Sequence, residues 1–294
     1  MSFFADLWQL SFLQRTLLAG LLAALACGGI GTLVVARRST YVAGAIAHCV
    51  LGGMGAAYWL SHPAGGGLSW LTPLMGATVA AVTAALIIAA VSSSDRRRLD
   101  TTLSALWAIG MAVGVSFIAA TPGYGTDLMS YLFGSILLVG TGELWLMAAL
   151  DTVIVAALLL CHDRFLAISF QEELARLRGL RTGLYRTLLH VLTALTVVLL
   201  AQVVGVVLVI ALVTLPAATA LRLVPRLGTA MLLAAVLCFA CIVGGLALAY
   251  GPDLPPGATI IELAGGLYLA VVGGQALVRW RRRLSPEAKA KLIR

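Results

Sequence analysis

The chain has 294 residues, of which 61% are apolar and 11% are charged, and its formal net charge is +8. Soluble domains average about 45–50% apolar and about 25% charged residues, so this composition excludes a soluble globular protein and indicates an integral membrane protein. Apolar runs of about 17–25 residues predict an all-α polytopic fold with eight or nine transmembrane helices. These spans take up the whole chain, so we expect residues 1–294 to form a single membrane domain.

The expected spans follow one another from end to end. They are residues 12–35, 41–60, 68–91, 101–120 and 144–160, two spans within 187–221 divided near Gln202–Gly205, and residues 228–250 and 258–278. Residues 127–143 have an apolar core too short to cross, so they predict a short helix or re-entrant turn at the outer face. The second span is rich in small residues that allow close helix contact, namely Gly44, Gly52, Gly53 and Gly55.

The basic residues alternate with uncharged loops, which accounts for the net charge without a nucleic-acid partner. Apart from Arg15, all of them lie in five patches: Arg37–Arg38, Arg96–Arg98, Arg164 to Arg186, Arg222–Arg226 and Arg279 to Arg294. The polar gaps 61–67, 121–127 and 251–257 contain no lysine or arginine. The positive-inside rule therefore predicts that the patches and the C-terminus face the cytoplasm and the gaps face outward. With an odd number of spans, the N-terminus also lies outside.

The most polar interior stretch, residues 164–186, predicts a short amphipathic helix with its own start and stop signals. Ser169 followed by Glu172 is typical of a capping box, and Gly179 supplies a left-handed residue that ends the helix. Apolar residues recur between these signals at helical spacing, at Phe170, Leu174 and Leu177. Such a helix is either a docking surface for another protein or a helix that lies on the lipid headgroups.

The chain contains no nucleotide-binding motif. Its only lysines are Lys289 and Lys291, so a G-x-x-x-x-G-K-[ST] loop is excluded and any ATPase must be another chain. The H-E-x-x-H motif of zinc proteases is absent too, and we expect neither an enzyme nor a bound cofactor. The cysteines lie in or at the ends of apolar runs, where we expect small apolar packing roles. They are Cys27, Cys49, Cys161, Cys238 and Cys241.

Polar residues within the spans are costly in lipid and usually face a cavity or a partner. His48 lies near the middle of the second span, where it is either packed against a neighbouring helix or one of several metal ligands. Cys49 is about 100° around the helix, so we do not expect both side chains to line one path. Asp151 is expected to pair with Arg15 or to accept a hydrogen bond from another helix. Together with Glu262 in the last span, it leaves open a channel or a carrier driven by an ion gradient.

Several segments, in this order, resemble the membrane permease of bacterial zinc- and manganese-uptake ABC transporters over nearly the whole chain. The matching runs are FLQRTLLAGLLAALACGGIGTLVVARR, AIAHCVLGG, DLMSYLFGSILLVG, LAISFQEELARLRGL, VVGVVLVIALVTLPAATALRL and LPPGATI. The resemblance implies a type II ABC importer-like permease in the bacterial cytoplasmic (inner) membrane. In that family two copies of the permease form the pathway, two ABC ATPase subunits dock beneath, and an extracytoplasmic metal-binding protein delivers the metal.

The same resemblance implies roles for individual residues. Residues 164–186 become the cytoplasmic coupling segment, whose ATPase-contacting residues are Ser169, Phe170, Glu172, Glu173, Leu174, Leu177 and Gly179. The run DLMSYLFGS becomes a short outer helix at the mouth of the pathway. His48 becomes a metal ligand within a family motif that has an aspartate four residues earlier. This chain departs from the motif, because Gly44 occupies the aspartate position and Gly52 replaces a common proline.

Without the aspartate, the two His48 side chains of a dimer would bind metal together with water or other ligands. Imidazole suits zinc, whereas manganese prefers oxygen ligands. We therefore expect an ABC permease for a divalent transition metal, with zinc favoured over manganese or iron. A carboxylate introduced by Gly44→Asp is expected to strengthen binding and to shift it towards manganese. A metal chelate or cobalamin-like cargo is the alternative within this class, and the ion-gradient carrier is the alternative outside it.

Overall fold

The computed structural model describes residues 6–7, 9–63, 65–92, 96–121, 139–252 and 254–284. Throughout these residues the regular secondary structure is helical and no strand occurs. Nine of the described helices are long and apolar enough to cross a membrane. The all-α, polytopic fold predicted from the sequence is confirmed.

The described helices follow the predicted spans closely. The first span is α2 (Ser11–Ala26), continued by the π-helical turn η1 (Cys27–Gly31) and α3 (Thr32–Ala36). The others are α4 (Thr40–Ser61), α5 (Pro73–Val91), α6 (Arg96–Ala120), α8 (Thr141–Leu160), α11 (Thr182–Val204), α12 (Val206–Leu223), α13 (Leu227–Tyr250) and α14 (Pro256–Leu284). Two short helices, α9 (His162–Phe170) and α10 (Glu172–Leu177), lie between α8 and α11. Most of the short outer helix expected at 127–143 lies outside the described residues.

Local signals set two of the helix boundaries. Gly205 has a φ of 84°, a left-handed conformation that glycine adopts without a steric cost, and it separates α11 from α12 where the long apolar run was expected to break. Pro73 is the first residue of α5, and the Thr72 hydroxyl accepts a hydrogen bond from the Met75 N–H. Proline is favoured in the first turn because it has no N–H that could go unpaired there.

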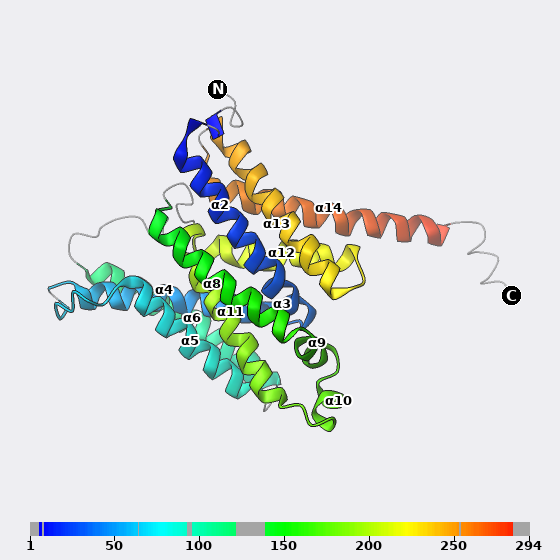
Figure 1. Cartoon of the computed structure of the whole chain (residues 1–294), viewed down its shortest axis with the longest axis horizontal. Helices are drawn as coiled ribbons and strands as arrows, with labels where there is room; N and C mark the ends of the chain where they lie inside the picture. Colours follow the sequence, from blue (N-terminus) through cyan, green and yellow to red (C-terminus); the bar gives the residue numbers. More distant parts are fainter. Residues whose placement is uncertain are drawn as a thin grey trace.

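Helix α4 is largely buried, and it packs mainly against α5 and α6 (Figure 1). Its glycines permit this, because a Cβ on Gly52 would press on the Gly110 carbonyl of α6, and a Cβ on Gly55 would press on the Gly114 carbonyl. Gly53 lies in the same way against Gly76 of α5. The close helix contact predicted from these small residues is confirmed.

Helices α9 and α10 lie at one end of the molecule, beyond the ends of α8 and α11 (Figure 1). Helix α14 packs against α12 and α13, but its C-terminal part extends away from the other helices (Figure 1). The five cysteines are free thiols, four of them buried and Cys161 partly buried. The fold therefore places a compact pair of short helices at the end of a bundle whose most enclosed element carries His48.

Candidate functional site

The short helices between α8 and α11 differ from the single capped helix predicted for this stretch. Ser169 lies inside α9 rather than at a helix start, and its buried Oγ has no hydrogen-bond partner among the described residues. Helix α10 begins after Gln171, and no side chain caps it. The predicted capping box is therefore wrong, because the α9 helix continues through Ser169 to Phe170.

The end of this segment follows the sequence signal. Gly179 has a φ of 81°, and its N–H donates to the Arg176 carbonyl at 3.0 Å. The Leu180 N–H donates to the Ala175 carbonyl at 3.0 Å. These two bonds form a Schellman motif, in which a left-handed glycine lets the chain satisfy the last carbonyls of a helix.

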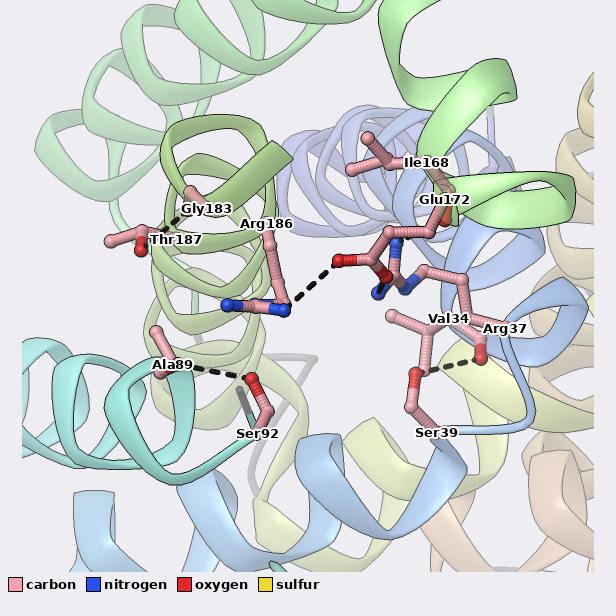
Figure 2. A network of polar contacts seen from close by, with 10 residues as sticks. All are labelled: Val34, Arg37, Ser39, Ala89, Ser92, Ile168, Glu172, Gly183, Arg186 and Thr187. Atoms are coloured by element: carbon pink, nitrogen blue, oxygen red, sulfur yellow. Dashed lines mark hydrogen bonds and ion pairs between the residues drawn. The ribbon is translucent and has the colours of Figure 1, made fainter. Parts of the chain in front are cut away.

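Glu172, the first residue of α10, forms an ion pair with an arginine on each side (Figure 2). Its Oε1 accepts from Arg186 Nη1 of α11 at 2.9 Å, and its Oε2 lies 3.4 Å from Nη2 of Arg37, which follows α3. Arg37 also donates from Nη1 to the Ile168 carbonyl at 2.9 Å. The side chains of Arg37 and Arg186 are 12% and 14% exposed. One carboxylate thus ties the short helices to the ends of two membrane-spanning elements.

This arrangement depends on Glu172 for its charge balance. Burial lowers the pKa of the Arg37 guanidinium, and the nearby Arg186 lowers it further, whereas Glu172 raises it. Two largely buried guanidiniums without the carboxylate would repel each other in a region of reduced dielectric constant. Glu172 therefore has an inward-facing, anchoring geometry, unlike the neighbouring Glu173, which is exposed.

Three apolar residues of the segment are exposed, although Phe165 and Ile168 are buried. Phe170, Leu174 and Leu177 are 62%, 41% and 83% exposed, whereas Ala175 is buried. We call Phe170, Leu174 and Leu177 the outer apolar face. Exposed apolar residues on two short helices, one of them anchored by ion pairs, are suited to docking another protein.

His48 lies on the inner side of α4 and is 6% exposed. Its ring lies against the indole of Trp107 from α6, with 4.5 Å between ring centroids and 32° between ring planes. Its Nδ1 has no hydrogen-bond partner within the described part of the chain. The neighbouring Cys49 has a different partner, because its thiol donates to the Leu106 carbonyl at 3.4 Å. His48 thus keeps a free nitrogen lone pair or N–H beside an aromatic ring.

Trp107 also explains the glycine one turn before His48. A Cβ on Gly44 would overlap the six-membered ring of Trp107. The indole therefore occupies the space in which a side chain at position 44 would have to lie. Sequence reasoning did not identify Trp107, and the missing side chain at Gly44 was the one signal in the sequence that pointed to a filled space there.

One copy of the chain offers few side chains that could bind a metal ion together. Among the described residues, no group of three or more His, Cys, Asp or Glu side chains could hold a metal ion. His48 would therefore supply one nitrogen ligand per chain, and a site would need further ligands from water or from a second copy.

The two acidic residues of the spans lie in different environments. Asp151 lies on the buried stripe of α8 between Met147 and Ile154, and it is 3% exposed. Within the described residues neither of its oxygens accepts a hydrogen bond, so the structure shows neither the expected pair with Arg15 nor a bond to another helix. Glu262 is exposed on α14.

Comparison with known proteins gives a consistent result over nearly the whole chain. The model of the ABC 3 transport family matches residues 9–274. A probable metal transport system membrane protein of Chlamydia pneumoniae is 35% identical over 92% of this chain and 91% of its own length. The manganese transport system membrane protein MntC of Halalkalibacterium halodurans is 31% identical over 90% of this chain and 88% of its own length. The structure is similar to PsaBC from Streptococcus pneumoniae in complex with Fab, with a TM-score of 0.79, 28% identity, and coverage of 92% of this chain and 94% of that one.

Proposed function

The chain belongs to the ABC 3 transport family, as a multi-pass permease of a metal transport system, and on that premise we propose that it forms the pathway of an ATP-driven importer for a divalent transition metal. Family membership removes the carrier driven by an ion gradient as an explanation of Asp151 and Glu262. The chain lacks a phosphate-binding loop, so ATP hydrolysis is assigned to a separate ATPase chain.

We propose zinc rather than manganese or iron as the cargo. The observation that carries this choice is the contact of Trp107 with both Gly44 and His48, which leaves an imidazole without a carboxylate one turn away. Neutral imidazole is a good ligand for zinc, whereas manganese favours oxygen donors. The MntC relative of Halalkalibacterium halodurans is named for manganese transport, and we expect this chain to differ from it in the metal.

The proposed assembly contains two copies of the chain, each of which supplies one His48 to the metal site. The outer apolar face and Glu173 are assigned to the ATPase contact, and Glu172 to the anchoring of that contact. An extracytoplasmic metal-binding protein is expected to supply the ion. The alternation of basic and uncharged loops supports a location in the bacterial inner membrane with the C-terminus in the cytoplasm.

The metal content of cells tests this proposal. Cells that lack the gene, grown with limiting metal, are expected to contain less zinc than the parent strain, with manganese and iron unchanged. A plasmid copy of the wild-type gene should restore the zinc content of the cells. A copy that carries Trp107→Ala tests whether zinc uptake depends on the side chain packed against His48. Loss of manganese with normal zinc would contradict the choice of metal while leaving the importer function intact.

A further inference from the structure

A polar cavity lies beside the Glu172 ion pairs, among the start of α4, the end of α5, the start of α6, and α11. Its volume is about 290 Å³, and its lining includes Arg37, Arg38, Arg186 and His190. Arg37 directly follows the first span, and Ser92, also in the lining, directly follows α5. The cavity therefore lies where membrane-spanning helices end, on the side that carries the basic patches, and there we expect the lipid headgroups.

The lining carries more positive than negative charge. Three arginines face two carboxylates, Asp100 and Glu172. Both oxygens of Glu172 are already used by Arg37 and Arg186 (Figure 2). Arg38 is exposed and forms no ion pair within the described part of the chain. Among the arginines and carboxylates of the lining, one positive charge is in excess.

One buried nitrogen in the lining lacks an acceptor. Arg186 Nε has no hydrogen-bond partner among the described residues, although Nη1 of the same guanidinium contacts Glu172. His190 also lines the cavity, is 5% exposed, and lies in the electrostatic field of Arg37 and Arg186. A buried donor that remains unpaired is costly, so an acceptor located in the cavity would stabilise the Arg186 Nε–H.

We propose that this cavity binds a phosphate group. A phosphate offers several acceptor oxygens and a negative charge, and arginine guanidiniums match its geometry with paired N–H donors. The source is either free inorganic phosphate or the headgroup of an anionic phospholipid, because both present the same oxygens at this depth. The bound phosphate would accept hydrogen bonds from Arg38, Arg186 and His190. It would thereby fix the position of Arg186, whose ion pair with Glu172 anchors α10.

Binding is tested on the full-length chain purified in detergent in phosphate-free buffer. Inorganic phosphate is added at constant ionic strength and the midpoint of thermal unfolding is recorded. In parallel, native mass spectrometry counts phosphatidylglycerol and phosphatidylcholine molecules retained by the protein. The variants are Arg38→Gln at the cavity mouth and His190→Gln in its wall. The control is Arg226→Gln, which removes an exposed arginine before α13 that does not line the cavity.

The expected result is binding of one of the two probes by the wild type and by Arg226→Gln. Arg38→Gln and His190→Gln should weaken it by roughly tenfold or more, as for loss of one hydrogen bond to a charged group. A thermal shift with phosphate identifies the free anion, and selective retention of phosphatidylglycerol identifies the lipid. The proposal is overturned if the wild type binds neither probe, or if Arg226→Gln weakens binding as much as the cavity variants. None of these outcomes depends on which metal is transported.

Discussion

The indole of Trp107 packs against the imidazole of His48, with ring centroids 4.5 Å apart, and the same indole fills the space beside Gly44. This contact changes the chemistry expected at the proposed metal site. A carboxylate at position 44 would share a helix face with His48, since residues four apart on a helix are neighbours. Here an aromatic ring takes that place, and only the imidazole is left for the proposed metal site.

Gly44→Asp alone is therefore expected to destabilise the protein, in contrast to the stronger metal binding expected from the sequence. The new Cβ overlaps Trp107, and overpacking of a buried site typically costs about 1–3 kcal/mol. The measurement is the midpoint of thermal unfolding in detergent. Gly142→Asp is a suitable control, because no atom lies within 4 Å of a Cβ at that glycine.

The double variant Gly44→Asp with Trp107→Ala is expected to shift transport towards manganese. Removal of the indole opens the space for the carboxylate, which supplies the oxygen ligand that manganese prefers. The ratio of manganese to zinc uptake should rise relative to both wild type and Trp107→Ala alone. An unchanged ratio in a stable double variant would mean that the space beside His48 does not determine the metal.

The outer apolar face is expected to bind the ATPase. Leu174→Asp combined with Leu177→Asp places two charges on exposed leucines, so the chain should insert normally but no longer co-purify with the ATPase. Leu254→Asp, at an exposed leucine in the gap 251–257, is the matched control and should co-purify as well as wild type. Co-purification of the double variant at the wild-type level would place the ATPase contact elsewhere.

Glu172 and Glu173 are expected to behave differently although they are adjacent. Glu172→Gln removes the negative charge that forms ion pairs with Arg37 and Arg186. The free energy that holds α10 in its packed position should fall by about 1–3 kcal/mol. Hydrogen exchange of the α10 amides should therefore accelerate, and transport per ATP hydrolysed should fall. Glu173→Gln changes an exposed carboxylate that has no ion pair within the described residues, so exchange at α10 should stay as in wild type.

The orientation of the chain is tested with single cysteines in a cysteine-free background. Leu254→Cys lies in an exposed gap expected outside, and Arg178→Cys lies in the exposed segment expected inside. An impermeant thiol reagent added to whole cells should label the first and not the second. Labelling of Arg178→Cys alone would reverse the topology.

The sequence was sufficient for the spans because hydropathy and chain-breaking residues act locally. The apolar run 187–221 is too long for one span, and Gly205 divides it in the structure as expected. The capping box predicted at Ser169 was wrong because the motif covers only four residues. It contains no information on whether the preceding helix, here α9, has already ended.

The contacts that define the candidate sites join residues far apart in the chain. Arg37 and Glu172 are 135 positions apart, and Arg37 and Ile168 are 131 apart. Trp107 reaches His48 from another helix. Periodicity along one helix contains no information on such pairs, so the sequence could place His48 and Glu172 in their helices but not identify what each one touches.

The most direct test of the proposed function is ATP-dependent metal uptake by proteoliposomes that contain the chain, its ATPase and the binding protein. Wild type is expected to take up zinc faster than manganese, and His48→Ala should reduce zinc uptake by about tenfold or more, because a lost metal contact has at least that effect. Assembly with the ATPase, measured by co-purification, should be unchanged in His48→Ala. Zinc uptake by His48→Ala at the wild-type rate, or faster uptake of manganese by the wild type, would contradict the account.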